Sequence, residues 1–468
     1  MLKSYFFILL ALCSVGVFAQ PHFSTLTFEE AAKKADKENK LVMLVITSEK
    51  CVQCNDVAEA GLVAAKKSID SNCILIRQPR FPVELNVANS IYIVPKDFFG
   101  IIWFDAQLNI LQILPSSSTM AYPYIQGIQR AIAEMRSNTG SFKELKHNYY
   151  NKVGDFVVIR KLVDKVLKIG FEPHPDLIDE LTQKAPDDSA TAISFLQYVL
   201  RCAPIVGSTA QKFVEKQKDN YMIAWYNMPL RERQVINSRI TFKSINKAIE
   251  DKNLSFAYQV AAFRQTTYTT DKPEEGPKAN MQLMLTYYKG VNDTVNYMRN
   301  VFSFYERYYM NIKPEDIRKE DSLAQLKLLK TNGSGIPPEI FAQIPDSIRV
   351  KLSKTTSVQG VQRNMIQFTP RGQFYANALN EGAWDVYTFS KNAAYLSKAL
   401  LLAKRGLEFY ESAELIDTYA RLLYRTGNKM EAINWEEKAI KIRSTMRFST
   451  AAFETVLNKM KQGEENID

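Results

Sequence analysis

The chain has 468 residues, of which 46% are hydrophobic and 11% aromatic, and its formal net charge is +10 at pH 7. This length and apolar content are enough for about two to four domains with packed cores. The charge is spread along the chain without a basic stripe or a recognisable nucleic-acid module, so we expect no nucleic-acid partner. Five cysteines are too few for a scaffold held together by disulfides, so stability has to come from packing.

Residues 1–19 have the pattern of a secretory signal peptide. Lys3 supplies the charged start, Phe6 to Leu12 the apolar stretch, and Val17-Phe18-Ala19 a small-residue cleavage site. The apolar stretch is shorter than the ~20 residues that cross a bilayer. We expect an exported protein, periplasmic or secreted, whose mature chain begins at Gln20.

The first predicted helix of the mature chain covers about residues 27–38. Thr27 and Glu30 are spaced as a capping box, with the threonine at the N-cap and the glutamate three residues later. An apolar run then begins at Leu41, and its β-branched composition predicts a strand that is buried on both faces. The segment from Asn55 to Ser68 has the composition of an amphipathic helix.

Two cysteines lie where this strand passes into this helix. Unpaired backbone N–H groups and the positive end of the helix dipole stabilise a thiolate there, so the pKa of a thiol can fall from ~8.5 to about 7 or below. Cys51 is the candidate nucleophile, and Cys54 can attack the mixed disulfide that Cys51 forms with a substrate. Lys50 adds a local positive charge, and Glu49 is a candidate proton carrier.

Three more strands and a closing helix are predicted before residue 137. Cys73 to Ile76 has the composition of a strand, and Phe99 to Phe104 and Leu108 to Leu114 form a predicted hairpin. The turn of this hairpin would be Asp105-Ala106-Gln107. The segment from Met120 to Arg136 predicts the closing helix.

This order of elements, together with four short motifs, resembles the thioredoxin family in its exported bacterial form. The motifs are Phe28-Glu29-Glu30-Ala31, Lys40-Leu41-Val42, Cys51-Val52-Gln53-Cys54 and Ile101-Ile102-Trp103-Phe104-Asp105. The resemblance covers residues 20–136 and implies an α/β thioredoxin-like domain. It also implies thiol–disulfide exchange with protein thiols or disulfides, in which Cys51 attacks, Cys54 resolves and no cofactor takes part.

Three positions depart from the thioredoxin pattern. Lys50 stands where an aromatic residue usually precedes the first cysteine, and Val45 stands where a buried carboxylate usually relays protons. The cis-proline that faces the cysteine pair in the family would fall near Phe99, whereas the nearby proline is Pro95. Pro95 is therefore the candidate cis-proline, and a site without one would hold substrate peptides differently.

Other interpretations of the cysteine pair stay open: an inert disulfide, a zinc site and a carrier site for Cu(I). Zinc is disfavoured because a second pair of ligands is missing and His22, His147 and His174 lie outside the redox core. Soft thiolates at this spacing can hold Cu(I). Cys73 and Cys202 have apolar neighbours and are expected to be buried core thiols.

Residues 137–331 are predicted to form an all-helical region. Amphipathic segments of ordinary length alternate with breaks such as Glu172-Pro173-His174-Pro175. One helix face collects large side chains, which we interpret as core packing between helices rather than a ligand site. These side chains are Tyr297, Val301, Phe304, Tyr305 and Tyr308.

Residues 332–338 predict a linker, because they combine helix breakers with polar residues. Residues 339–468 predict a further helical region, and its part from about 383 to 445 resembles tetratricopeptide repeats. Ala420, Gly427, Ala432 and Ala439 occupy the positions where small residues let paired helices approach closely. Stacked repeats form surfaces for protein partners, and plain structural support is the alternative.

We therefore expect an exported thiol–disulfide oxidoreductase whose helical region positions protein partners. Its reduced state would depend on a membrane electron donor. The alternative is a non-catalytic interaction scaffold with an inert thioredoxin-like domain. Replacement of Cys51 by serine separates the two, because it would abolish reductase activity but leave partner binding almost unchanged.

Overall fold

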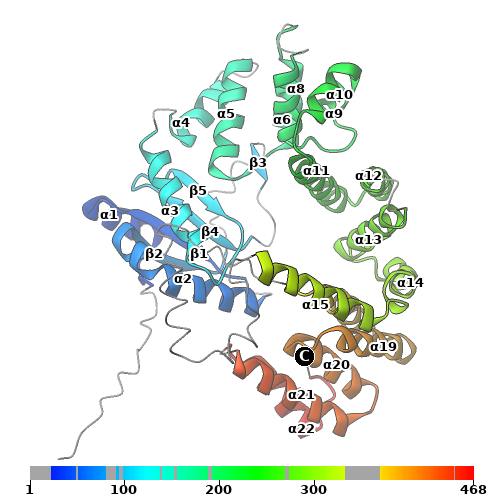
Figure 1. Cartoon of the computed structure of the whole chain (residues 1–468). Coiled ribbons are helices and arrows are strands. Elements are labelled where there is room, and N and C mark those ends of the chain that lie inside the picture. Colours follow the sequence, from blue (N-terminus) through cyan, green and yellow to red (C-terminus); the bar gives the residue numbers. More distant parts are fainter. Residues whose placement is uncertain are drawn as a thin grey trace, which may run out of the picture. The chain divides into compact units, whose positions relative to one another are not determined.

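The computed structural model describes residues 23–48, 51–80, 91–93, 98–137, 140–151, 155–187, 192–268, 273–331, 369–446 and 448–467. The chain divides into two compact units, Met1–Lys243 and Ser244–Asp468, and the division falls inside one long helix. A sheet lies in the first unit, and the described part of the second is helical (Figure 1). The predicted signal peptide and the predicted linker, residues 1–19 and 332–338, lie outside the described residues.

The first unit begins with the predicted order of helices and strands, to which the structure adds one short strand at Tyr92–Ile93. The elements are α1 (Phe28–Glu38), β1 (Leu41–Ile46), α2 (Val52–Asn72), β2 (Cys73–Gln78), β3 (Tyr92–Ile93), β4 (Gly100–Phe104), β5 (Ile110–Leu114) and α3 (Tyr122–Met135). Helices then predominate: α4 (Phe142–Asn151), α5 (Phe156–Ile169), β6 (Glu172–Pro173), α6 (Pro175–Gln183), α8 (Ile193–Arg201), α9 (Thr209–Lys216), α10 (Lys218–Tyr226) and α11 (Leu230–Glu250).

The main sheet has four strands in the order β2-β1-β4-β5. Strand β1 is parallel to β2 and antiparallel to β4, and β4 is antiparallel to β5. The crossover from β1 to β2 runs through α2, as parallel strands require. The predicted hairpin is confirmed, and Asp105 closes its turn by accepting hydrogen bonds from the backbone N–H groups of Gln107 (3.0 Å) and Asn109 (2.8 Å).

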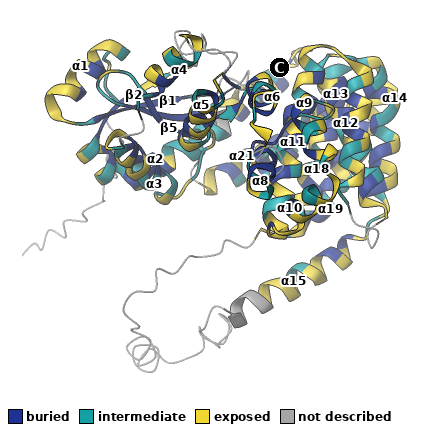
Figure 2. Cartoon of the chain, turned by 90° about the horizontal axis from the view of Figure 1, so that it is seen from above, coloured by how far each residue is buried: buried dark blue, intermediate teal, exposed yellow. Residues whose placement is uncertain are grey.

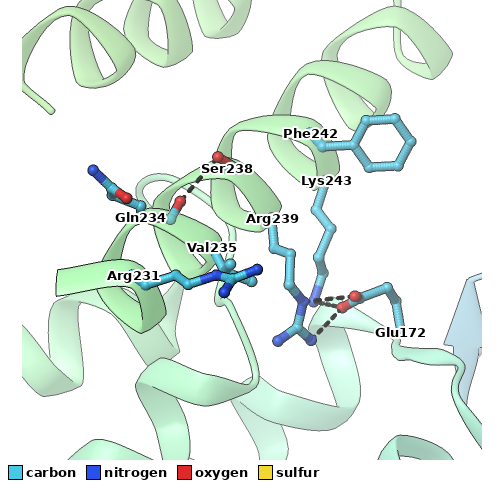
Figure 3. Close-up of a pocket in the computed structure, with 8 residues that line it drawn as sticks. All are labelled: Glu172, Arg231, Gln234, Val235, Ser238, Arg239, Phe242 and Lys243. Carbon is cyan, nitrogen blue, oxygen red and sulfur yellow. Dashed lines mark hydrogen bonds and ion pairs between the residues drawn. The ribbon is translucent and has the colours of Figure 1, made fainter. Parts of the chain in front are cut away.

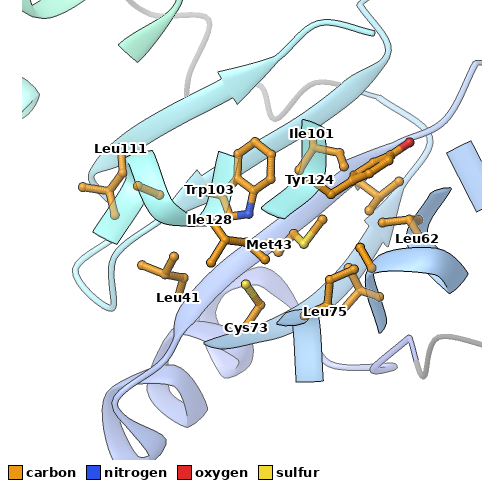
Figure 4. Packing of buried hydrophobic residues seen from close by; sticks show 14 residues of the cluster. Leu41, Met43, Leu62, Cys73, Leu75, Ile101, Trp103, Leu111, Tyr124 and Ile128 are labelled. Carbon is orange, nitrogen blue, oxygen red and sulfur yellow. The ribbon is translucent and has the colours of Figure 1, made fainter. Parts of the chain in front are cut away.

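Helices cover both faces of this sheet. The side chains of Met43, Trp103 and Tyr124 pack in one apolar cluster with residues of α2 and α3, so these two helices share a face (Figure 4). Helix α1 lies on the other face, where Phe28 packs edge to face against Phe104 with ring centroids 4.8 Å apart. All six residues of β1 are buried, as the apolar run predicts (Figure 2).

Local sequence signals define α1 and let α3 approach the sheet. The predicted capping box is present, because Glu30 N–H donates to Thr27 Oγ1 (3.2 Å) and Thr27 N–H donates to Glu30 Oε2 (2.8 Å).

Gly127 of α3 packs against the indole of Trp103, where a Cβ atom would overlap the ring. A side chain at position 127 would therefore push α3 away from β4.

The α/β part of the first unit is joined to the helices that follow it. Glu134 of α3 is buried, accepts a hydrogen bond from Lys165 of α5 and forms an ion pair with Lys168 of the same helix at 2.7 Å. Helix α5 also packs on strand β5. The first compact unit therefore extends past the predicted boundary at residue 136 and includes α4 to α10.

A second, two-stranded sheet corrects the prediction that residues 137–331 are purely helical. Tyr92 pairs with Pro173 and Ile93 with Glu172 in an antiparallel arrangement. The ring of Tyr92 stacks on Phe171 with centroids 4.2 Å apart. Pairing with a partner distant in sequence decides this strand, because two residues carry too little periodicity to predict it.

The second unit consists of paired helices. After the last turns of α11 come α12 (Leu254–Thr266), α13 (Glu275–Gly290), α14 (Thr294–Tyr305), the π-helical turn η2 (Glu306–Met310), α15 (Pro314–Thr331), α18 (Arg371–Phe389), α19 (Ala393–Phe409), α20 (Ala413–Arg425), α21 (Lys429–Thr445) and α22 (Ala451–Gln462). The aromatic face predicted at residues 297–308 is buried, which confirms its role in core packing. Asp321 of α15 accepts hydrogen bonds from the N–H groups of Arg371 and Gly372, so the helices on either side of the predicted linker are in contact.

The small residues expected between paired helices are present in α20 and α21, with one correction. Ala420, Ala432 and Ala439 are fully buried, as close helix approach requires. Gly427 instead follows the end of α20 with a φ of 94°, and a Cβ there would meet nothing within 4 Å. Glycine at position 427 permits the left-handed backbone conformation that ends helix α20.

A buried acidic pair lies between these two helices. Glu436 is fully buried and adjoins Asp417, whose carboxylate accepts a hydrogen bond from Arg421 Nε at 2.8 Å. Burial, and then the neighbouring Asp417, raise the pKa of Glu436 well above its ordinary value. Arg421 offsets only part of this rise. The folded protein therefore keeps Glu436 protonated at neutral pH.

The effect of Glu436→Gln on the free energy of unfolding is expected to be more favourable at pH 8 than at pH 5, by on the order of 2 kcal/mol. In the unfolded chain Glu436 ionises above its ordinary pKa, so its contribution to stability is full at lower pH and is lost as pH rises toward the raised folded pKa. Glutamine has no proton to lose and can still donate to Asp417. Chemical unfolding at both pH values tests this.

Glu437→Gln is the matched control, because Glu437 is half exposed and pairs with Lys461 at the surface. We expect its effect on the free energy of unfolding to be about 0–1 kcal/mol at either pH. An equal effect of Glu436→Gln at pH 5 and pH 8 would contradict the protonated state of Glu436.

Candidate functional site

The cysteine pair lies at the start of α2, directly after the central strand β1. Cys51 and Cys54 form a disulfide with their Cα atoms 5.2 Å apart. Cys51 is the N-cap residue of the helix, and its Sγ accepts a hydrogen bond from the backbone N–H of Cys54 at 3.1 Å. The predicted placement of both cysteines is confirmed.

This position favours negative charge on Cys51 when the disulfide is reduced. Helix α2 has 21 residues, and no acidic residue lies in its first turn to offset the positive end of its dipole. The N–H group that now contacts Cys51 Sγ would stabilise a thiolate at the same place. Both cysteines are half-buried.

A hydrogen-bonded clamp holds the loop that carries Cys51. The side chain of Asn55 bridges the backbone of Ser48: its Oδ1 accepts from Ser48 N–H at 2.9 Å, and its Nδ2 donates to Ser48 O at 2.8 Å. Ser48 Oγ in turn accepts from the N–H of Cys51 at 3.1 Å. Neither Ser48 nor Asn55 was predicted to belong to the site, although short polar side chains near a helix N-terminus are a known signal for such bonds.

Asn55→Ala is expected to destabilise the protein by about 1–2 kcal/mol, because it leaves the half-buried N–H and C=O of Ser48 without these bonds. Thermal or chemical unfolding measures the loss. The matched control is Asn72→Ala at the other end of α2, which removes one bond, from Asn72 Nδ2 to Ser68 O. If both variants lower the free energy of unfolding by the same small amount, the hydrogen bonds of Asn55 do not stabilise this part of the chain.

Several residues that the sequence analysis assigned to the site lie outside the described residues. These are Glu49, Lys50 and the candidate cis-proline Pro95, whose roles stay predictions. Val45, at the position of the relay acid in the family pattern, is buried in the apolar cluster on the α2 side of the sheet. Proton transfer to Cys54 therefore cannot use a carboxylate on the side chain at position 45.

The other two described cysteines are not suited to exchange chemistry. Cys73 on β2 and Cys202 after α8 are free and buried, as expected for core thiols. Burial raises the pKa of each thiol to about 12. Neither forms a thiolate at neutral pH, so Cys51 and Cys54 are the candidates for exchange chemistry among the described cysteines.

No metal site is evident in the described part of the chain, where no group of three or more His, Cys, Asp or Glu side chains converges. His147 contacts Asn151 on α4, and His174 caps α6 by accepting from the N–H of Asp176. Among the described helices, none is long and apolar enough to cross a membrane.

Comparison with known proteins yields no relative. No protein-family model, curated protein or solved structure matches the chain. A functional assignment therefore depends on the geometry of the cysteine pair and on the arrangement of the helices and strands around it.

Proposed function

We propose that this protein is a thiol–disulfide oxidoreductase that acts through Cys51 and Cys54. The observation that carries the proposal is the position of Cys51 at the N-cap of α2, where its sulfur accepts a backbone hydrogen bond and lies at the positive end of a long helix. Nucleophilic thiols need this kind of environment.

The proposal includes a thioredoxin-like fold for residues 20–136. Its support is the strand order β2-β1-β4-β5, with β1 parallel to β2 and antiparallel to β4. The cysteine helix α2 and the closing helix α3 pack on the same face of this sheet. Such a scaffold places the pair at the end of a rigid central strand, which suits a site that must hold its geometry during exchange.

The exchange conserves atoms and electrons. In the reduced protein, the Cys51 thiolate attacks one sulfur of a substrate disulfide, forms a mixed disulfide and releases a substrate thiolate. Cys54 then loses its proton and attacks Cys51 Sγ, which forms the Cys51–Cys54 disulfide and releases the second substrate thiolate. Two electrons pass to the substrate, and an external dithiol donor must restore the reduced pair.

We propose the wider setting as follows. The protein is exported, the donor is a membrane protein that delivers electrons across the envelope, and the helical region positions protein substrates. The antiparallel helix pairs α18–α19 and α20–α21, with small residues buried between them, support a tetratricopeptide-like arrangement. Repeats of this kind commonly bind peptide segments of other proteins.

The reduction potential of the Cys51–Cys54 pair tests the proposal. Purified protein is equilibrated with glutathione or dithiothreitol buffers, and free thiols are trapped by alkylation. We expect a potential between about −270 and about −120 mV, the span of known exchange proteins. A potential below about −300 mV is typical of structural disulfides and would overturn the proposal.

The second candidate function is a non-catalytic interaction scaffold. It is favoured by the size of the helical part and by the cationic and apolar side chains exposed on α11. In that case the disulfide would be inert and binding would not depend on its redox state.

A further inference from the structure

One face of α11 in the first unit borders a hollow of about 510 Å³ (Figure 3). Arg231, Val235, Arg239 and Phe242 follow one another at spacings of three or four residues, so they share this face. Glu172 of β6 forms part of the opposite edge. Between positions 231 and 242 the helix rises about 16 Å, the length of roughly five residues of extended peptide.

The charged groups of this hollow are fixed in place and mostly positive. Arg239 donates to both carboxylate oxygens of Glu172 at 2.6 Å and to the carbonyl oxygen of Arg201 at 2.6 Å. Lys243 is buried and donates to the carbonyl oxygen of Cys202 at 3.0 Å. Glu172 therefore has its charge already satisfied by a bidentate partner.

Arg231 is the third cation that lines the hollow, and it differs from Arg239 in having no carboxylate beside it in the part of the chain that the structure describes. Among the described residues, no carboxylate lies within ion-pair distance of Arg231. Three cations and one carboxylate line the hollow, which gives it a surplus of positive charge. An uncompensated arginine beside fixed cations attracts an anionic group.

Apolar side chains accompany these charges. Val235 is 52% exposed and Phe242 is 55% exposed on the same helix face, and Figure 3 shows Phe242 extending away from the Glu172 carboxylate. Tyr226 and Leu230, just before and at the start of α11, are 61% and 62% exposed. Large apolar side chains that gather in this way beside charged ones are characteristic of protein-binding surfaces.

We propose that this face of α11 binds an acidic peptide segment of another protein, in which carboxylate side chains alternate with apolar ones. A carboxylate would pair with Arg231, the positive charge of Arg239 would favour acidic neighbours, and the apolar side chains would cover Val235 and Phe242. Extended peptides present alternate side chains to opposite sides, so about five residues can span the face. The inference does not depend on the chemistry of the cysteine pair.

Fluorescence anisotropy tests the proposal with the full chain and a labelled octapeptide that alternates glutamate with leucine. We expect saturable binding, whereas an octapeptide that alternates lysine with leucine does not bind. Arg231→Glu should weaken binding at least about tenfold and Phe242→Ser at least about fivefold. Both side chains are exposed, so circular dichroism should show both variants folded.

Arg130→Glu is the matched control, because Arg130 is exposed on α3 and the charge change is identical. Equal effects of Arg231→Glu and Arg130→Glu would overturn the proposal. So would equal binding of the acidic and basic peptides, or equal binding of a peptide that alternates glutamate with serine. Self-association that Arg231→Glu abolishes, without peptide binding, would assign the face to a second copy of the chain instead.

Discussion

Replacement of Cys51 by serine is expected to lower disulfide reductase activity at least about 100-fold, to the background rate. The variant keeps the backbone N–H groups at the start of α2, but its hydroxyl does not ionise at neutral pH and cannot attack a disulfide. Reduction of a disulfide-containing protein substrate with dithiothreitol as the electron donor measures the loss. Because Cys51 is half-buried at the end of the helix, the fold should change little.

Cys54→Ser provides the complementary result. It leaves the Cys51 nucleophile in place and removes the group that resolves the mixed disulfide, so covalent complexes with substrate should accumulate. Non-reducing electrophoresis detects them. The exchange mechanism is wrong if Cys51→Ser retains reductase activity, or if Cys54→Ser traps no complex while Cys51 is reduced. Either result would favour the interaction scaffold.

Glu134→Ala is expected to lower the free energy of unfolding by about 3–5 kcal/mol, which is more than a typical surface change produces. The Glu134 side chain is only 4% exposed and the Lys165 side chain 5%, so removal of the carboxylate takes an opposite charge away from a buried ammonium group. Urea unfolding of the full chain, followed by circular dichroism, measures the change.

Two further variants separate the buried charge from simple loss of packing. Lys168→Ala removes the other cation of Glu134, but the Lys168 side chain is 50% exposed, so we expect a loss of about 0–1 kcal/mol. The double variant Glu134→Leu with Lys165→Met removes both buried charges and should recover most of the stability lost in Glu134→Ala. If the double variant is no more stable than Glu134→Ala, the ion pair does not explain the effect.

Local sequence signals were sufficient to predict the helices and strands around the cysteine pair. Thr27 and Glu30 predicted the start of α1 because a capping box acts within three residues. The apolar run from Leu41 predicted a doubly buried strand, and the polar turn at Asp105 predicted the hairpin, because both depend on residues close in sequence. The position of Cys51 and Cys54 at a helix start followed from the same local pattern.

The contacts that support the site and its scaffold depended on how the chain folds, not on the motif alone. Asn55 follows the motif directly, yet its bonds to Ser48 exist only because Ser48 lies beside the first turn of α2 in the folded chain. The position of Gly127 beside Trp103 also requires that α3 pack on the sheet. Composition and spacing do not specify these contacts.

The sequence by itself determined the strands of the main sheet and the helices around them, the cysteine pair at a helix N-terminus and the apolar surroundings of the buried thiols. Each of these depends on propensity, periodicity or capping within a few residues. Only the tertiary structure decided that α5 joins the sheet through Glu134 and Lys165, that β3 pairs with β6, and that cations and apolar side chains meet on α11. These features arise when segments far apart in sequence exclude water from a shared surface, and burial then fixes which charges must pair.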